Sequence, residues 1–213
     1  TPIEATQLFI RRVIGTEELP LAITRLQRAT RNSGAPATAK FIKGWLAEPV
    51  DPPRTPLWIW GAGHVGQAVV QIAAQLENFD ITWVDTNPNR FPSEIPSNVT
   101  VVPAAEPAHL MLHVPIKAHH LIFTYSHALD LALCHAALKR GFAFCGLIGS
   151  KSKWTRFKSR LSALGHSNSI ILKITCPIGD PNLGKQPIAI AIGVTQSLLA
   201  VHNSLANQRS ARA

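Results

Sequence analysis

The stretch Trp58-Ile59-Trp60-Gly61-Ala62-Gly63-His64-Val65-Gly66 decides the fold, because it sets a Gly-x-Gly-x-x-Gly pattern directly after a short apolar run. Such a pattern is weak when it stands alone. Here a helix-like segment follows it, and Asp85 ends the next apolar run. A phosphate-binding loop of the dinucleotide type requires these surroundings. We therefore expect a strand, a glycine turn and a helix that open a Rossmann-like domain.

Each glycine of this loop has a physical task. Gly61 permits the tight turn, Gly63 lets backbone N–H groups approach a phosphate, and Gly66 lets the helix pack close to the strand. The helix that starts at His64 and Val65 offers unpaired N–H donors and a partial positive charge to an anion. We predict that these five residues bind a cofactor. The alternatives are that the glycines serve packing alone and that His64 merely fills a turn position.

Two charged residues follow the second predicted strand. Asp85 stands about where a dinucleotide-binding domain carries the acid that accepts hydrogen bonds from two ribose hydroxyls. Its alternative role is to cap the turn at Asn87-Pro88. Arg90 comes five residues later. It either holds a phosphate or forms an ordinary ion pair with Asp85.

The chain from residue 57 onward alternates strand-like and helix-like segments. Strands are predicted over 57–60, 81–84, 99–102, 121–124, 142–148 and 170–175, and helices over 64–76, 107–112, 128–139, 152–164 and 187–203. This alternation favours a parallel sheet with right-handed crossovers. The predicted fold class is α/β, a Rossmann-like three-layer domain with a mostly parallel sheet over residues 57–205. A frayed tail is predicted over 206–213.

The first quarter of the chain has a different rhythm. Apolar residues at three- and four-residue steps predict a short helical segment over residues 1–47, with helices over 4–13, 17–31 and 38–46. Four prolines then stand within eight residues, at Pro49, Pro52, Pro53 and Pro56. Such a density of proline cannot continue a helix and stiffens a linker. We predict a linker over 48–56 and place the domain boundary there.

Small and polar residues follow three later strands, at the edge where an open parallel sheet binds ligands. The candidate cofactor-binding residues there are Ser126, His127, Asp130, Gly149, Ser150, Lys151 and Cys176.

Each group has a structural alternative. Ser126 or His127 can cap the next helix, and His127 and Asp130 can form a surface pair. Lys151 suggests a second anion contact, but it can equally sit in a plain loop. A thiol at Cys176 is a candidate ligand for a soft metal, although a buried structural cysteine is common.

Composition excludes several classes of protein. Of 213 residues, 46% are apolar and 15% charged, which is enough apolar material for a core. No apolar run approaches the ~20 residues of a membrane span, so we expect no membrane partner. Three cysteines without a Cys-x-x-Cys motif suit a reducing cytoplasm rather than a disulfide scaffold. The net charge of +9 is spread out and lacks interleaved aromatic residues, so we expect no nucleic acid partner.

Four segments together carry a resemblance to a known family. They are Gly61-Ala62-Gly63-His64-Val65-Gly66, Ser126-His127-Ala128-Leu129-Asp130, Gly146-Leu147-Ile148-Gly149-Ser150-Lys151 and Cys176-Pro177-Ile178-Gly179. In this order, over about residues 57–199, they resemble the C-terminal half of the xanthine dehydrogenase accessory protein family, also called XdhC/CoxI proteins.

The resemblance implies a cytoplasmic, non-catalytic chaperone that binds the molybdenum cofactor (molybdopterin), a pterin dithiolene with a phosphate. Proteins of this family support sulfuration of the cofactor together with a cysteine desulfurase and hand it to xanthine dehydrogenase. The implied site holds the phosphate at the glycine loop and the molybdenum end near Cys176.

The sequence departs from the family pattern in three places. Nothing in residues 1–56 matches the N-terminal domain that family members usually carry. Because the chain starts at Thr1 and has Met111 as its only methionine, we expect the start of the gene product to be missing. Tyr125 stands where many members carry a histidine, and Asp180 replaces an apolar residue.

Other readings of the chain stay open. One rival function is an NAD(P)-dependent oxidoreductase, and another is a nucleotide-binding module without chemistry. Trp58, Trp60 and the apolar last helix leave room for a homodimer face.

Overall fold

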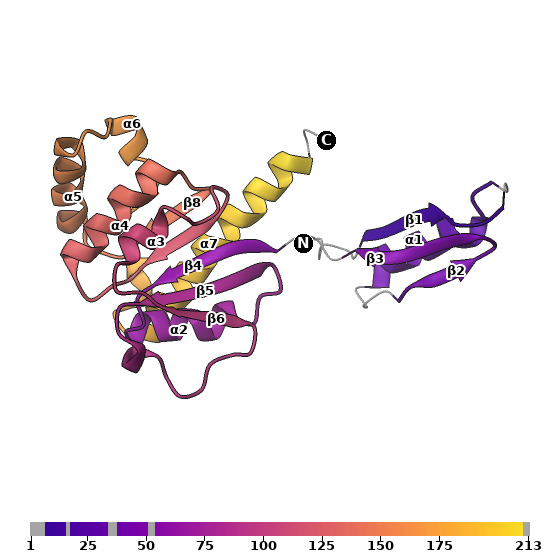
Figure 1. Cartoon of the computed structure of the whole chain (residues 1–213), viewed down its shortest axis with the longest axis horizontal. Helices are drawn as coiled ribbons and strands as arrows, with labels where there is room; N and C mark the ends of the chain where they lie inside the picture. Colours follow the sequence, from indigo (N-terminus) through magenta and orange to yellow (C-terminus); the bar gives the residue numbers. More distant parts are fainter. Residues whose placement is uncertain (1–6, 16–17, 34–37, 51–53, 211–213) are drawn as a thin grey trace. The chain divides into compact units, whose positions relative to one another are not determined.

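The computed structural model describes residues 7–15, 18–33, 38–50 and 54–210. The chain divides into two compact units, Thr1–Pro53 and Arg54–Ala213, each with its own sheet (Figure 1). The larger unit carries the glycine loop and is described first.

A six-stranded sheet forms the centre of the larger unit. Its strands are β4 (Thr55–Trp60), β5 (Phe79–Asp85), β6 (Val99–Pro103), β7 (His119–Ile122), β8 (Phe144–Leu147) and β9 (Ile174–Thr175). They lie in the order β6-β5-β4-β7-β8-β9, and every neighbouring pair is parallel. Counted from β4, this is the 3-2-1-4-5-6 order of a Rossmann domain, so the predicted fold class is confirmed. The strand order reverses between β4 and β7.

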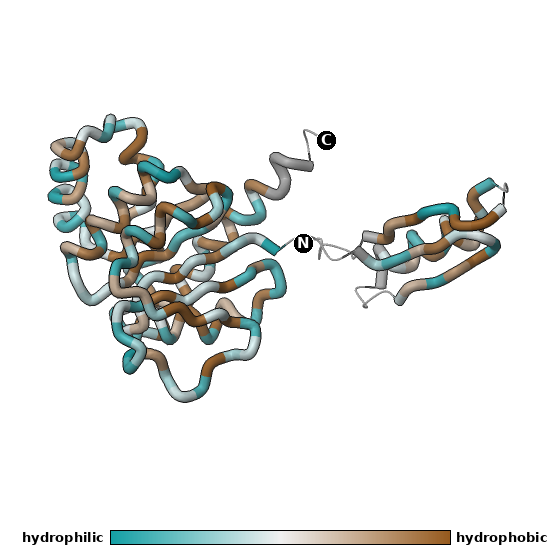
Figure 2. Tube along the Cα trace, in the orientation of Figure 1, coloured by the Kyte–Doolittle hydropathy of each residue, from teal (hydrophilic) through white to brown (hydrophobic). Residues whose placement is uncertain are grey.

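Helices cover both faces of this sheet. They are α2 (His64–Ala73), α3 (Pro107–Met111), α4 (His127–Arg140), α5 (Lys151–Ala163), α6 (Asn168–Ile171) and α7 (Pro187–Ser210), with short 3-10 helices η1 (Pro88–Arg90) and η2 (Pro181–Leu183). Successive strand residues point to opposite faces, so Ile59 packs into one buried cluster and Trp60 into the other. The cluster of Ile59 includes residues of α2 and α7, and that of Trp60 includes residues of α3, α4 and α5. In Figure 2 hydrophobic residues recur along both the strands and the helices of this unit, interspersed with hydrophilic ones.

α7 is the one described helix long and apolar enough to cross a membrane, over Pro187–Leu205, judged by length and composition alone. The expectation that no segment approaches this length is therefore wrong. α7 packs along α2 and buries Ala191, Val194 and Leu198, while 28% of this apolar window is buried in all. Ile192 on another side of α7 is half-exposed. The helix runs to Ser210, so no frayed tail begins at 206, and residues 211–213 lie outside the described residues.

The last predicted strand is mostly wrong. Residues 168–171 form the short helix α6, and only Ile174 and Thr175 pair with β8. Ile171 and Ile174 are both buried, at three-residue spacing, while Ile170 and Leu172 are exposed. A short apolar run of this kind does not distinguish strand from helix by periodicity.

The smaller unit is a three-stranded antiparallel sheet with one helix. Its elements are β1 (Gln7–Arg12), α1 (Leu21–Ser33), β2 (Lys40–Ile42) and β3 (Trp45–Val50), with the sheet order β1-β3-β2. Ile23 of α1 and Ala47 of β3 are fully buried in it.

Over the residues that the structure describes, the predicted helical segment over 1–47 is thus wrong except for α1, while its residues 1–6, 16–17 and 34–37 lie outside the described ranges. Lys43 and Gly44 both have positive φ, +47° and +80°, which is the two-residue hairpin turn that joins twisted antiparallel strands. This turn converts the predicted helix over 38–46 into β2 and β3. In the predicted linker, residues 48–50 belong to β3 and residues 55–56 to β4, while 51–53 lie outside the described residues.

Candidate functional site

An open cleft of about 380 Å³ lies at the carboxyl edge of the sheet, where the strand order reverses. Its lining comes from the loop after β4, the start of α2, η1 and the loop after β7. The lining residues are Ala62, Gly63, His64, Gln67, Arg90 and Tyr125. Both its size and its position at the switch point are typical of small-molecule sites in open α/β folds, which measure roughly 300–1,000 Å³.

The three glycines of the loop differ in what they do. Gly61 has φ of +117°, and a Cβ there would lie 2.5 Å from the carbonyl oxygen of Phe123. A Cβ at Gly66 would collide with the carbonyl oxygen of Gly61. Gly63 has an ordinary φ of −74°, and no atom lies within 4 Å of an added Cβ. The fold therefore requires Gly61 and Gly66, whereas Gly63 leaves open space in the cleft.

The N-terminus of α2 faces this space without a cap from a side chain. Gly63 occupies the N-cap position, and the first intrahelical bond runs from Gln67 N to Gly63 O at 2.9 Å. The N–H groups of the first turn before Gln67 have no intrahelical acceptor and carry a partial positive charge. His64 lines the cleft and is exposed, whereas Val65 packs against the core on the α2 side. An anion in the cleft would meet these donors.

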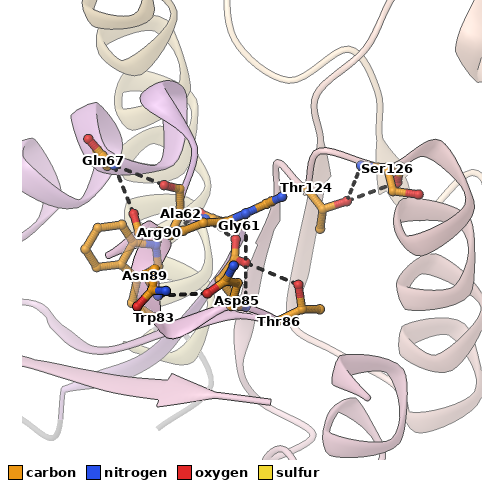
Figure 3. A network of polar contacts seen from close by, with 11 residues as sticks. Gly61, Ala62, Gln67, Trp83, Asp85, Thr86, Asn89, Arg90, Thr124 and Ser126 are labelled. Atoms are coloured by element: carbon orange, nitrogen blue, oxygen red, sulfur yellow. Dashed lines mark hydrogen bonds and ion pairs between the residues drawn. The ribbon is translucent and has the colours of Figure 1, made fainter. Parts of the chain in front are cut away.

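The Asp85 carboxylate is directed at the backbone of the glycine loop and of the turn that follows β5. Its Oδ2 accepts a hydrogen bond from Ala62 N at 2.7 Å, and its Oδ1 accepts one from Asn87 N at 3.1 Å. Figure 3 shows Asp85 among these polar contacts. Its side chain is only 2% exposed. Asp85 thus fastens the end of β5 to the glycine loop and caps the turn at Asn87. The geometry adds nothing in favour of its predicted contact with a ribose.

Arg90 forms the ion pair with Asp85 that was one of its two predicted roles. Its Nε lies 3.8 Å from Asp85 Oδ1, and its guanidinium carbon lies 3.7 Å from the centroid of the Tyr125 ring. Gln67 holds the backbone in place, since Nε2 donates to Ala62 O and to Arg90 O, both at 3.1 Å. The arginine side chain remains 35% exposed and lines the cleft. It is both an ion-pair partner and a cation available to a ligand.

A buried ion pair joins the first turns of α4 and α5, the helices that follow β7 and β8. Lys153 Nζ lies 2.6 Å from Asp130 Oδ2, and the two side chains are 8% and 1% exposed. Asp130 Oδ1 accepts hydrogen bonds from the backbone N–H of Thr124 and, at 2.6 Å, from its hydroxyl. Lys153 also donates to Ile148 O at 2.9 Å. Asp130 therefore positions the loop that carries Tyr125 and does not reach the cleft itself.

The other candidates of these two loops also lie outside the cleft lining. Ser126 caps α4 and Ser150 caps α5, each accepting a backbone N–H three residues on. His127 is exposed and its ring lies nearly perpendicular to that of Phe157, and Lys151 is exposed at the start of α5. A Cβ at Gly149 would lie 2.6 Å from the Lys153 side chain, so this glycine makes room for the buried lysine.

Cys176 is half-buried against the cluster that contains Trp60 and is not among the residues that line the cleft. Burial raises the pKa of its thiol to about 11, so the thiol is protonated at neutral pH. Cys134 and Cys145 are buried free thiols, and burial raises the pKa of each. In the described ranges no three His, Cys, Asp or Glu residues are grouped to hold a metal ion.

Sequence reasoning missed three residues that build this region: Gln67, Tyr125 and Lys153. Gln67 stands one helical turn after Gly63, which was a usable signal. Lys153 stands four residues before Phe157 and eight before Leu161, so helical spacing places it on the buried face of α5. Tyr125 gave only the signal of its position after a strand.

Comparisons with known proteins agree with this architecture. Residues 57–197 match the family model of the XdhC Rossmann domain. The uncharacterized protein YqeB of Escherichia coli (strain K12) is 29% identical over 157 residues, which cover 71% of this chain and 28% of YqeB. A crystal structure described as a xanthine dehydrogenase from Bacillus halodurans superposes with a TM-score of 0.60 at 22% identity, covering 76% of this chain and 46% of that chain. The chain thus spans less than half the length of either relative.

Proposed function

The chain belongs to the XdhC Rossmann-domain family, and from that membership we propose that it is an accessory factor for the maturation of xanthine dehydrogenase. It binds and protects a cofactor rather than turning over a substrate. The family match over residues 57–197 and the four motifs support this role. The observation that carries the proposal is the anion-receptive cleft that this domain forms at its switch point.

The proposed cargo is the molybdenum cofactor, and the cleft suits its phosphate end. The N–H groups at the start of α2 and the guanidinium of Arg90 would hold the phosphate, in the space that Gly63 leaves open. The ring of Tyr125 offers a flat surface for the pterin. When bound, the cofactor carries the molybdenum chemistry that the recipient enzyme uses. Cys176 lies outside the cleft lining, so no sulfur ligand is assigned to the molybdenum end.

The proposed partners are apo xanthine dehydrogenase, which receives the cofactor, and a cysteine desulfurase, which supplies its sulfur. Three free cysteines are compatible with the reducing cytoplasm that we propose as its compartment. A homodimer stays a prediction, but its face needs revision. Trp60 is 1% exposed and stacks on Trp58 at 5.5 Å, so it is not a surface residue. The half-exposed Ile188 and Ile192 of α7 remain as candidates.

A reconstitution experiment tests the proposal. Molybdopterin released from a molybdoenzyme is mixed with the purified chain, separated by gel filtration, and the retained pterin is measured by fluorescence after oxidation. The loaded protein is then added to apo xanthine dehydrogenase with and without a cysteine desulfurase. We expect retained pterin and faster recovery of activity than with free cofactor. Absence of both would refute the proposal.

The alternative candidate is a nucleotide-binding module, favoured by the glycine loop and the 3-2-1-4-5-6 strand order. The same titration with NAD(P)H distinguishes it. Nucleotide binding without any retention of molybdopterin would favour the module, and turnover of an added substrate would favour an oxidoreductase.

A further inference from the structure

We infer that the cleft selects a phosphate monoester and rejects a ribose diol, and that Arg90 is the residue that determines this specificity. The inference deepens the proposed function and rests on its assignment of the cleft as the ligand site. Two neighbouring side chains carry it. The Asp85 carboxylate is buried and hydrogen-bonded to the backbone, whereas the Arg90 guanidinium is partly exposed in the cleft.

The carboxylate of Asp85 is already engaged. A ribose diol binds a Rossmann domain by donating two hydroxyl hydrogen bonds to an acid at this position. Here each carboxylate oxygen already accepts a backbone N–H, from Ala62 at 2.7 Å and from Asn87 at 3.1 Å. With 2% of the side chain exposed, a diol would reach it only if the turn at Asn87 opened.

The guanidinium of Arg90 is available instead. It carries five N–H donors, and it donates no hydrogen bond to any residue in the described parts of the chain. Its one ion pair runs through Nε at 3.8 Å, which leaves the two terminal nitrogens for a ligand. Its position is set by the Tyr125 ring beneath it and by the Gln67 amide that binds its backbone. A fork held in this way suits the oxygens of a phosphate.

The charged groups that line the cleft favour an anion. Among the described lining residues Arg90 is the one with a permanent charge, its neighbour Asp85 is 2% exposed and outside the lining, and the start of α2 adds partial positive charge. A phosphate monoester has a second pKa of about 6 and carries close to two negative charges at neutral pH. Two ligand sources share this chemistry: the 2′-phosphate of NADP and the terminal phosphate of molybdopterin. Both also carry a flat ring system that can stack against Arg90 and Tyr125.

The test compares ligands that differ by one phosphate. Isothermal titration measures NADP⁺ and NAD⁺ on the whole chain, on Arg90→Gln, on Arg90→Lys and on Arg156→Gln, a matched arginine change on the exposed face of α5. We expect the parent chain to bind NADP⁺ roughly 10- to 100-fold more tightly than NAD⁺, the range for charge-assisted hydrogen bonds. Arg90→Gln should bring this ratio close to one, Arg90→Lys should restore part of it, and Arg156→Gln should keep it. Thermal melts of all variants check folding.

A second arm identifies the source of the phosphate. Molybdopterin released from a molybdoenzyme is titrated alone and against NADP⁺ on the parent and on Arg90→Gln. Binding of either ligand that depends on Arg90 supports the inference and names the source. Three results would overturn the inference. The first is equal affinity for NAD⁺ and NADP⁺ together with molybdopterin binding that does not depend on Arg90. The second is an equal loss of affinity for both nucleotides in Arg90→Gln, and the third is a parent chain that binds neither NADP⁺ nor molybdopterin. Activation of apo xanthine dehydrogenase is measured separately, so selectivity with no activation refutes the proposed function alone.

Discussion

Replacing Gly63 by alanine separates ligand binding from folding. The backbone at Gly63, with φ −74° and ψ 179°, accepts any residue, and no atom lies within 4 Å of an added Cβ. Where the backbone accepts alanine, a Gly→Ala change stabilises the folded protein by about 0.4–1 kcal/mol, because it lowers the conformational entropy of the unfolded chain. The weaker N-cap preference of alanine offsets this gain. The free energy of unfolding should therefore change by less than about 1 kcal/mol.

Ligand affinity should fall in the same variant. The new methyl group occupies the side of the cleft from which an anion approaches the start of α2, so at least one charge-assisted hydrogen bond is lost. Such a bond contributes about 1.5–3 kcal/mol, which predicts roughly a 10-fold or greater loss of affinity for a phosphate-bearing ligand. Titration of the ligand and thermal melts are measured on the same preparations.

Gly66→Ala is the matched control, because its Cβ would meet the backbone carbonyl of Gly61 instead of open space. Overpacking of this kind costs about 1–3 kcal/mol or more. In a unit of this size that lowers Tm by roughly 2–4 °C per kcal/mol. Parent-like affinity in Gly63→Ala would refute the placement of the anion. A Tm of Gly63→Ala as low as that of Gly66→Ala would refute the reasoning about open space.

Three further predictions concern buried groups. Lys153→Met should lower the free energy of unfolding by about 3–5 kcal/mol in chemical denaturation, because Asp130 is left as an unpaired buried carboxylate. Adding Asp130→Asn to this variant should recover part of the loss, and no recovery would contradict the prediction. Cys176 should react with iodoacetamide at pH 8 about 100-fold more slowly than in the unfolded chain, since its pKa is near 11; equal rates would contradict a protonated thiol. Burial and the neighbouring His119 lower the pKa of His120 to about 3. Between about pH 6.5 and 3 the unfolded chain therefore binds one proton more than the folded chain. The free energy of unfolding falls as the pH falls through that window, by up to about 1.4 kcal/mol per pH unit. His120→Leu should remove this slope from denaturation curves measured against pH, and an unchanged slope would argue against it.

The Rossmann domain could be predicted because its local signals agree with one another. The glycine loop and the cap at Ser126 each mark an element boundary where the structure has one. The smaller unit gave no such agreement. Its strands are short, and their pairing depends on the turn at Lys43 and Gly44, which a three- and four-residue apolar spacing does not reveal.

The site was predictable to the level of strand ends and no further. The sequence places Asp85, Asp130 and Cys176 after strands, but it does not tell which side chains face the cleft. Asp130 is turned inward by Lys153, a residue two positions beyond the predicted Lys151 and on another side of α5. Asp85 is turned inward by backbone donors, which leave no trace in residue identity.

The bond between Asp85 and Ala62 has a consequence for redesign. The Asp85 carboxylate joins the end of β5 to the turn after β4, so it stabilises the loop against which any ligand would bind. An engineer who mutates Asp85 to alter what the protein captures would loosen that loop at the same moment. Substitutions that aim to change ligand specificity should begin at Arg90 and Tyr125. Their side chains can be replaced while the hydrogen bond between Asp85 and Ala62 is kept.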